Sequence, residues 1–233
     1  MMTQAIPIEM ELKLSVSPEM QSKFMPDLSE AGSAHLFARL AATFAFAGFR
    51  LEEAKTANQS DQYFDTESDA LETAGHCVRL RWGAGHPSLT VKKAGLPQKG
   101  IFNRPEYEAK ISQEEIDKLF ATGFDSLVRE RFPELGGKRL KEVLQIETRR
   151  HQVLVRKPNE AYKVCLDLST FIEPKSKARS PVSVEVEIEA QGGTTSSALE
   201  AVRKALTDIF PEFSLGQKSK QRRGAEFART RTR

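Results

Sequence analysis

The sequence has no apolar stretch of the roughly 18 residues that a membrane-spanning helix needs. Cysteine is scarce as well, because Cys77 and Cys165 are the only two, far apart and each inside an apolar segment. They lack the close spacing of a metal-binding pair, so we expect two buried thiols. The four histidines show no ligand spacing either. These absences argue against a helical membrane protein, a disulfide-rich fold and a zinc site.

Two common motifs of nucleotide-binding proteins and hydrolases are also missing. The chain contains neither a P-loop nor a G-x-S-x-G elbow. Recognition of a phosphate group would therefore have to come from side chains and not from a glycine-rich loop. The net charge is only +3, since 35 Lys and Arg nearly balance 32 Asp and Glu. The positions of the acids and bases consequently carry more information than their sum.

Length and composition fit one globular domain. With 233 residues, 39% hydrophobic and 29% charged, the chain can bury a substantial core. We expect a single domain over residues 1–233, ending in a basic tail after Gly216 that is solvated and flexible beyond about residue 224. The N-terminus does not begin a secretory signal, so a cytoplasmic location is the default expectation.

Alternating apolar and polar residues predict eight β-strands. They are Ile8–Val16, Gln62–Asp65, Cys77–Trp82, Ser88–Lys93, Arg104–Ile111, Val143–Val155, Ala161–Leu168 and Val182–Ala190. Three helices interrupt them: Ser33–Ala47, one opened by a capping box of Ser112 and Glu115, and one opened by Ser197 and Glu200. Eight strands in meander order indicate an α+β fold, with either a closed antiparallel barrel or a strongly curved sheet and helices packed outside.

Charged side chains share one face of nearly every strand. Glu9, Glu11 and Lys13 alternate with apolar residues, and residues two apart on a strand share a face. Adjacent carboxylates on one face repel each other unless basic side chains or a cation lie nearby. Further sets of this kind are Glu185/Glu187/Glu189, Arg79/Arg81, Thr90/Lys92, Glu106/Glu108/Lys110, Glu147/Arg149/His151 and Lys163/Cys165/Asp167.

Two arrangements fit this pattern. In one, the polar faces look to water and the apolar faces pack on helices. In the other, the sheet closes with its charged faces around a wet lumen, which in an eight-stranded barrel has room for side chains or one small ligand. Burying many charges is costly unless they are paired with each other or bound to a ligand. The pattern alone therefore favours the arrangement in which the polar faces look to water.

The segments resemble, in their order, the CYTH family, also called triphosphate tunnel metalloenzymes. The matching pieces are the E-x-E-x-K signature at Glu9-Met10-Glu11-Leu12-Lys13, then Tyr63-Phe64-Asp65-Thr66, Val78-Arg79-Leu80-Arg81, Leu89-Thr90-Val91-Lys92, Arg104-Pro105-Glu106-Tyr107-Glu108, Glu185-Val186-Glu187, Ser219-Lys220 and Arg223-Gly224. The Arg-Pro-Glu-Tyr segment is most similar to the bacterial inorganic triphosphatase branch, whose members often add a C-terminal CHAD domain that this sequence lacks. An aromatic residue often follows the family's Arg-Gly pair, whereas Ala225 stands here.

This resemblance implies an eight-stranded tunnel that binds a linear triphosphate and hydrolyses it with Mg²⁺ or Mn²⁺. Bases would hold the phosphate oxygens, and carboxylates would supply the oxygen ligands of the cation. The phosphate-binding residues carried over are Lys13, Arg79, Arg81, Lys92, Arg149, Lys220 and Arg223, with Arg150 replacing Arg149 after a one-residue shift. The metal ligands are Glu9, Glu11, Glu185 and Glu187, with Asp167 and Glu189 as additions.

Glu106 resembles the family's water-positioning acid. It is therefore a candidate base, and Glu106, Lys92 and Arg79 form the expected catalytic group. The alternative interpretation of Glu106 and Glu108 is a lattice of ion pairs with neighbouring bases.

Several functions stay open within this fold. The leading one is hydrolysis of tripolyphosphate to pyrophosphate and phosphate. A class IV adenylyl cyclase, or a thiamine or nucleoside triphosphatase, needs an aromatic or apolar platform beyond the phosphates, and few aromatics stand on the charged faces. A non-catalytic module for polyphosphate or RNA is an alternative of another class. The expected partner is a small-molecule triphosphate; neither a membrane nor nucleic acid is expected, and a homodimer stays open.

Overall fold

The computed structural model describes residues 8–24, 28–83, 85–93, 97–122 and 140–231. Its strands are β1 (Ile8–Val16), β2 (Arg50–Leu51), β3 (Lys55–Asp65), β4 (His76–Trp82), β5 (Ser88–Lys93), β6 (Ile101–Lys110), β7 (Lys141–Lys157), β8 (Glu160–Ile172), β9 (Ser183–Gln191) and β10 (Phe213–Leu215). Its helices are α1 (Pro18–Phe24), α2 (Glu30–Phe46), α3 (Ala70–Thr73), α4 (Gln113–Thr122), α6 (Ser196–Ile209) and α7 (Lys220–Arg229).

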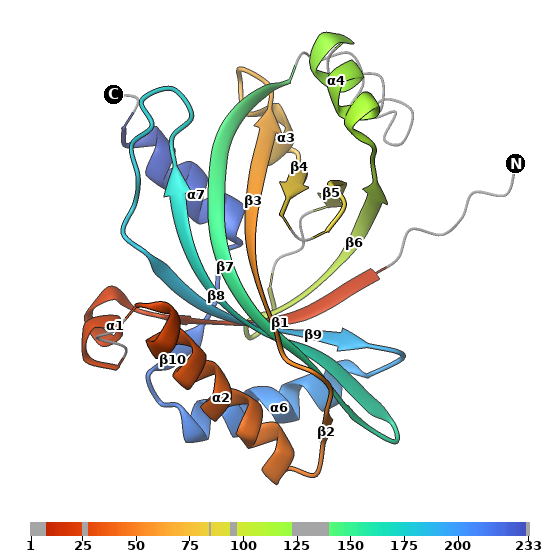
Figure 1. Cartoon of the computed structure of the whole chain (residues 1–233), viewed down its shortest axis with the longest axis vertical. Helices are drawn as coiled ribbons and strands as arrows, with labels where there is room; N and C mark the ends of the chain where they lie inside the picture. Colours follow the sequence, from red (N-terminus) through yellow and green to blue (C-terminus); the bar gives the residue numbers. More distant parts are fainter. Residues whose placement is uncertain (1–7, 25–27, 84, 94–96, 123–139, 232–233) are drawn as a thin grey trace, which may run out of the picture.

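Eight of the strands close into an antiparallel barrel (Figure 1). The hydrogen-bonded order is β1-β6-β5-β4-β3-β7-β8-β9, and β9 returns to β1. β1 closes the barrel because it pairs with β6 over Ile8–Leu12 and with β9 over Glu11–Ser15. The predicted eight-stranded barrel is confirmed, although β3, β7 and β8 extend beyond their predicted bounds and β6 begins three residues earlier, at Ile101.

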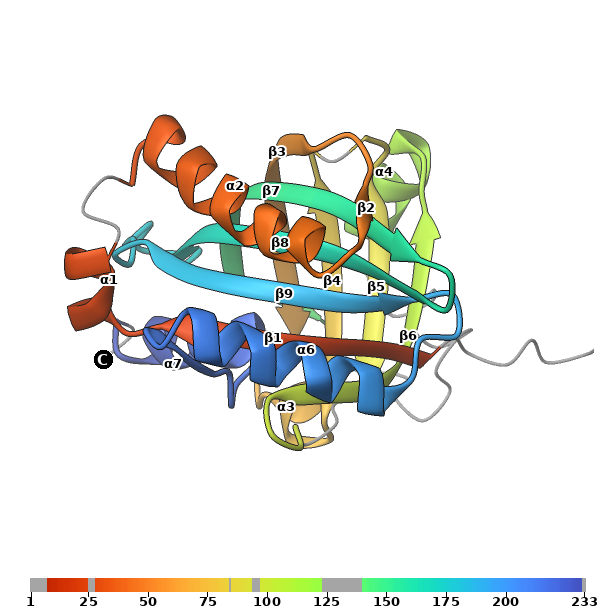
Figure 2. The same cartoon turned by 90° about the horizontal axis from the view of Figure 1, so that it is seen from below.

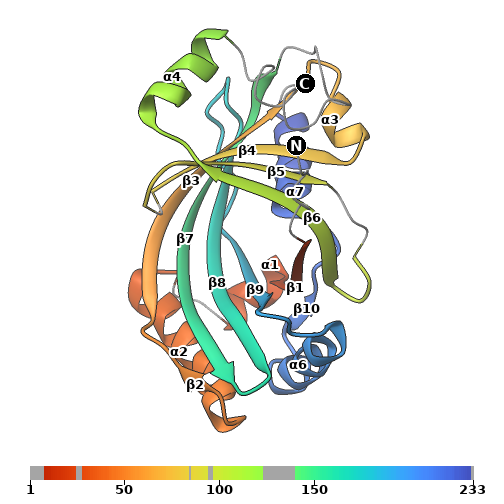
Figure 3. The same cartoon turned by 90° about the vertical axis from the view of Figure 1, so that its right-hand side faces the viewer.

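Apolar side chains lie on the outside of the barrel, where helices cover them. α2 and α6 lie across β1, β8 and β9 (Figure 2), and Leu40 and Leu206 pack there with Leu12 and Val186. At the other end of the long axis, α4 packs Ile116 against the apolar residues of β4 and β5 (Figure 3). The charged faces therefore point inward, which the sequence pattern alone did not favour.

The predicted helix start is confirmed for α4, where Ser112 and Glu115 hydrogen-bond to each other's backbone. In the predicted box before α4, Ser112 Oγ accepts from the Glu115 backbone N–H, and the Glu115 carboxylate accepts from the Ser112 N–H. α2 instead begins after Ser29, and α6 begins after Thr195, not at the predicted Ser197. In both cases the side-chain oxygen of the preceding residue accepts a hydrogen bond from the first turn.

The basic tail does not follow its prediction. Residues Lys220–Arg229 form α7, capped by Ser219, so the chain is helical beyond residue 224 where flexibility was expected. Phe227 anchors this helix against an apolar cluster of Tyr63, Leu144, Ile146 and Phe171. The many basic residues of this segment predicted a solvated tail, and they gave no indication that Phe227 would pack against apolar residues. Among the described residues, no helix has the length and apolar character to cross a bilayer.

Candidate active site

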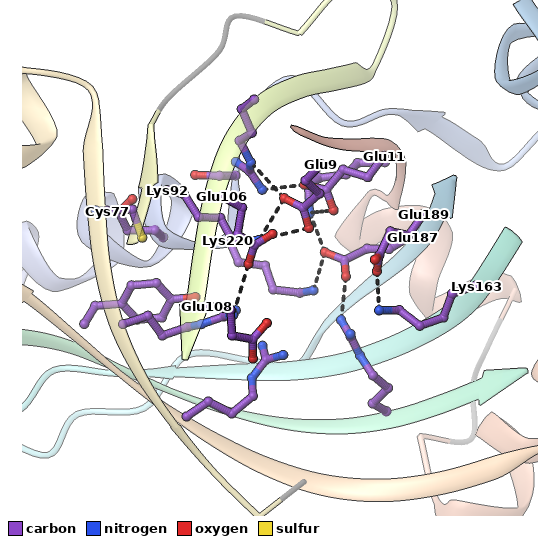
Figure 4. A pocket seen from close by; sticks show the side chains of 18 residues that line it. Glu9, Glu11, Cys77, Lys92, Glu106, Glu108, Lys163, Glu187, Glu189 and Lys220 are labelled. Atoms are coloured by element: carbon purple, nitrogen blue, oxygen red, sulfur yellow. Dashed lines mark hydrogen bonds and ion pairs between the residues drawn. The ribbon is translucent and has the colours of Figure 1, made fainter. Parts of the chain in front are cut away.

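A cavity of about 110 Å³, partly open to solvent, lies inside the barrel (Figure 4). Eight bases and six acids line it, and Tyr63 is the single aromatic among the described residues of its wall. The bases are Lys13, Arg79, Arg81, Lys92, Arg104, Arg150, Lys163 and Lys220, and the acids are Glu9, Glu11, Glu106, Glu108, Glu187 and Glu189.

One group of ion pairs joins β1, β5 and β6. Lys92 Nζ lies 2.8 Å from a Glu9 carboxylate oxygen and 3.0 Å from one of Glu106. Arg104 donates to Glu9 at 3.1 Å and also to Glu11. Strand register produces the group, because Arg104 lies opposite Glu9 and Lys92 lies opposite Glu106. The first two acids of the E-x-E-x-K segment are thus both paired with bases.

A second group surrounds Glu187 on β9. Its carboxylate accepts hydrogen bonds from Lys13, from Arg150 at 2.5 Å and from Lys220 at 2.7 Å. Lys13 lies directly opposite Glu187 in the β1–β9 register, and Lys220 enters from the first turn of α7. Arg150 and Lys220 also share Asp167. Bases from β1, β7 and α7 therefore meet at one carboxylate on β9.

The arginines of β4 face a buried carboxylate on β3. Arg81 donates to both oxygens of Asp61, with Nε and Nη2 each at 2.7 Å. Arg79 Nη1 lies 3.6 Å from the same carboxylate, and its Nη2 donates to Thr90 at 2.9 Å. Both guanidinium groups are therefore fixed before any ligand binds.

Burial and ion pairing shift the pKa values of two neighbouring carboxyl groups, Glu9 and Glu106, in opposite directions. Burial alone would raise the pKa of Glu9, but Lys92 and Arg104 outweigh it and lower that pKa well below its usual range. Burial raises the pKa of Glu106 above its usual value; Lys92 opposes the rise and Glu9 adds to it. Glu106 is accordingly the more basic of the two carboxylates.

Acid should destabilise the protein because four carboxyl groups in and around the cavity have pKa values below their usual range. Burial by itself would raise the pKa of Asp61, but Arg79 and Arg81 lower it from 3.8 to about 2. A lowered folded-state pKa gives stability that is complete above the unfolded value and is lost as pH falls towards the folded value, here about 2 kcal/mol. Glu9, Asp167 and Glu187 shift the same way.

We therefore expect the free energy of unfolding to fall steadily as pH drops from about 5 towards 2. Glu106 and Glu142 act oppositely, because a raised folded-state pKa favours the folded protein on acidification, but they are two groups against these four. Urea denaturation of the metal-free protein at a series of pH values measures the slope. A denaturation midpoint unchanged between pH 6 and pH 3 would contradict this expectation.

Most predicted site residues are brought together around the cavity. Five of the seven predicted phosphate-binding residues line it: Lys13, Arg79, Arg81, Lys92 and Lys220. Four of the six predicted metal ligands line it too: Glu9, Glu11, Glu187 and Glu189.

Three predicted residues lie behind the wall of the cavity. Asp167 and Glu185 are 0% and 1% exposed, and neither lines the cavity. Arg223 of α7 donates to Glu185 at 2.5 Å and to Ser183 at 2.7 Å, so it is engaged outside the cavity as well. Lys220 of α7 pairs with both acids, at 2.5 Å from Asp167 and 3.0 Å from Glu185, and the sequence does not predict this helix.

Arg149 is wrongly placed by the sequence prediction. It lies opposite Leu168 in the β7–β8 register and lines an outer groove with Trp82. Its neighbour Arg150, the alternative after a one-residue shift, points into the lumen. A shift of one residue turns every side chain to the other face, so His151 also lies outside, bonded to Ser33 of α2.

Sequence reasoning missed other residues of the site. Arg104 stands two residues before Glu106 on the same face, so strand alternation could have identified it. Lys163 was placed on a charged face but not in the site, where it pairs with Glu189. Asp61 lay outside the predicted strand, because the polar residues at the start of β3 give no alternating signal.

The acids of the cavity have the donor chemistry of a hard divalent cation. Carboxylate oxygens are the ligands that Mg²⁺ and Mn²⁺ prefer, and Glu9, Glu11 and Glu187 present them from β1 and β9. In the described part of the chain, no three acidic, histidine or cysteine side chains are grouped as a ready-made metal site. Each of these acids is engaged by a base instead, so cation binding requires that ion pairs exchange.

Comparison with known proteins identifies the fold. Among solved structures, a candidate adenylyl cyclase from Hippeastrum, described as having a dominant triphosphatase activity, is 18% identical with a TM-score of 0.58, and 95% of each chain is covered. A candidate adenylate cyclase from Bacillus halodurans is 18% identical with a TM-score of 0.56, covering 94% of this chain and 98% of that chain. Among curated protein sequences, none matches this chain significantly.

A family model agrees with this likeness over most of the sequence. It is described as the CYTH domain, and it matches residues 36–225. The match ends just after the Arg223-Gly224 pair and includes the arginines of β4, the acids of β9 and Lys220. The chain therefore belongs to the CYTH domain family.

Proposed function

We propose that the protein hydrolyses inorganic triphosphate to pyrophosphate and phosphate with a divalent cation, Mg²⁺ or Mn²⁺. The composition of the cavity wall carries this proposal. Eight basic and six acidic side chains place charge along the cavity wall. The described wall has no exposed aromatic ring on which a nucleobase or a thiazolium ring could stack. Tyr63 is only 4% exposed and packs with Leu144 and Ile146, so its ring face is not free for stacking.

The bases of the cavity suit the oxygens of a linear triphosphate. Lys13, Lys92 and Lys220 supply ammonium donors, and the arginines supply planar forks that bind phosphate bidentately. They come from different sides of the barrel: β1, β4, β5, β6, β7, β8 and the first turn of α7. A chain of three phosphates can thus be held from several directions and kept in line for attack.

Paired charges explain why substrate and cation should bind together. A triphosphate alone would draw bases such as Lys92 away from Glu9, leaving a buried carboxylate with one base fewer. A cation alone would leave the bases unpaired, and either outcome is costly. A complex of triphosphate and cation gives both sets of side chains a new partner, which supports a metal-dependent activity.

Glu106 is our proposed base for the attacking water. The water oxygen would form a bond to the terminal phosphorus while the bond to the bridging oxygen breaks and pyrophosphate leaves. The Glu106 carboxylate would accept the proton of that water, and its raised pKa brings it closer to neutral pH, where a general base is most effective. A bound Mg²⁺ or Mn²⁺ would supply polarisation of the phosphoryl oxygens.

A substrate panel tests the proposal. Tripolyphosphate, ATP and thiamine triphosphate are offered separately with Mg²⁺ and with Mn²⁺, and released phosphate and cyclic AMP are measured. We expect tripolyphosphate to give the highest kcat/KM, and we expect chelation of the cation to abolish turnover. Formation of cyclic AMP from ATP while tripolyphosphate stays intact would refute the proposal and favour a cyclase.

A further inference from the structure

Asp61 lies directly behind the wall of the cavity. It is 2% exposed and does not line the cavity itself. Both of its oxygens are used by Arg81, through Nε and Nη2 at 2.7 Å each, and Arg79 Nη1 lies 3.6 Å away. A fork with two parallel hydrogen bonds fixes the plane of a guanidinium group, which a single ion pair does not. The direction in which Arg81 points is therefore set by Asp61.

The two arginines need such a partner because of their position on β4. They are two residues apart, share the inward face, and are both largely buried. Like charges so placed repel each other. Asp61 lies opposite Arg81 in the β3–β4 register, so its carboxylate reaches both. Its lowered pKa of about 2 keeps it ionised at neutral pH.

We propose that Asp61 is a positioning residue that holds Arg79 and Arg81 in the orientation in which they meet the phosphates. The inference rests on the function proposed above and adds a residue that does not touch the substrate. Its effect should be on the geometry of bound substrate more than on the strength of binding. Removing its charge leaves the lumen more positive, which favours anion binding, while the arginines lose their fixed direction.

Asp65 offers a matched control on the same strand. It is also 2% exposed, but its carboxylate accepts hydrogen bonds from the backbone N–H groups of Thr66, Leu71 and Glu72 at the start of α3. It contacts neither arginine. Asp65→Asn therefore removes an equally buried carboxylate that is bonded to backbone N–H groups and not to the arginines.

Kinetics and calorimetry of Asp61→Asn and Asp65→Asn test the inference. For Asp61→Asn we expect kcat for tripolyphosphate to fall about 10- to 100-fold, the scale of a misplaced catalytic contact. Cation-free binding of tripolyphosphate, measured by calorimetry, should be as tight as in the unmodified protein or tighter. Asp65→Asn should lower the thermal midpoint while kcat and KM of the folded protein stay within about threefold.

A second variant covers the case in which Asp61→Asn does not fold. Asp61→Glu keeps the negative charge but moves it by one methylene, so kcat should again fall with binding unchanged. A kcat within threefold of the unmodified protein in the folded variants would overturn the inference. Weaker tripolyphosphate binding that accounts for the whole loss of activity would overturn it too.

The NMR signal of the Arg81 Nε–H provides a readout without turnover. Its hydrogen bond to Asp61 should slow exchange with water, and Asp61→Asn should reduce that protection, because the amide keeps one acceptor oxygen and its NH2 group cannot accept the second hydrogen bond. Undiminished protection in Asp61→Asn overturns the positioning role. Failure of the unmodified protein to hydrolyse tripolyphosphate instead refutes the proposed function, so the two failures are distinguishable.

Discussion

Replacing Glu11 or Glu187 by glutamine is expected to reduce tripolyphosphate hydrolysis by about 10²- to 10³-fold, the scale of losing one preorganised electrostatic contact at a reacting centre. Both carboxylates line the cavity and are candidate ligands of the cation. Glutamine has nearly the same shape but carries no charge. A neutral amide is a poor ligand for a hard divalent cation compared with a carboxylate.

Both variants should remain folded because every base they affect keeps another acid. In Glu11→Gln, Arg104 still bonds to Glu9 and Lys13 still bonds to Glu187. In Glu187→Gln, Arg150 and Lys220 keep Asp167, and Lys13 keeps Glu11 at 3.1 Å. No buried cation is left alone, which is the costly outcome when one partner of an isolated pair is removed.

The same two variants separate an enzyme from a passive polyphosphate-binding module. A purely basic binder should hold tripolyphosphate as well or better once an acid is neutralised, and it shows no turnover to lose. Hydrolysis and binding are therefore measured side by side on each variant. Glu147→Gln is the control, since Glu147 pairs with Arg179 on the exterior. Turnover within threefold of the unmodified protein in both cavity variants would disprove the role of these acids.

Strand alternation correctly placed the charged side chains of the lumen on one shared face of a strand where the other face is uniformly apolar, although it did not predict that this face points inward. In β1 and β9 the apolar residues pack under α2 and α6, so Glu11 and Glu187 necessarily face inward. The same logic fails in β7, where Arg149, Arg150 and His151 are three polar residues in succession. Their faces are decided by pairing with β8, which no local pattern encodes.

The sequence could not predict which acids of a strand line the cavity and which are covered by other parts of the protein. The acids of β9 look equivalent in a strand pattern, yet Glu187 lines the cavity while Glu185 is covered. The difference comes from α7, whose Lys220 and Arg223 reach these acids from a segment more than thirty residues later. Apart from Gly224 the residues of α7 are mostly good helix formers, but a helix of ten residues is marginal by itself, and tertiary contacts of Phe227 and Gly224 hold it in place.

Gly224→Ala should displace α7 and thereby disable the site. A Cβ atom at this position would lie 2.4 Å from Leu144 Cδ2 and 2.8 Å from Cδ1. Leu144 is fully buried among Tyr63, Ile146 and Phe171, so it has no free space into which to turn. Overpacking of this kind costs about 1–3 kcal/mol, against about 1 kcal/mol gained from replacing glycine by alanine in a helix.

Movement of α7 should be felt at Lys220, which stands one helical turn before Gly224 on the same side of the helix. Lys220 would withdraw from Asp167 and Glu187, leaving two carboxylates with one base fewer and the cavity with one phosphate donor fewer. We expect kcat/KM for tripolyphosphate to fall about 100-fold, comparable to a misplacement of 1 Å in a catalytic group. Steady-state kinetics and thermal unfolding measure the two effects.

A double variant shows whether the contact between Gly224 and Leu144 is the cause. Leu144→Ala alone should lower stability by about 2–5 kcal/mol through the cavity it leaves, but it creates room for a methyl group at residue 224. Adding Gly224→Ala to it should then cost no further stability and should leave the activity of Leu144→Ala unchanged. Additive losses in the double variant, or full activity of Gly224→Ala alone, would show that close packing at Gly224 does not set the position of Lys220.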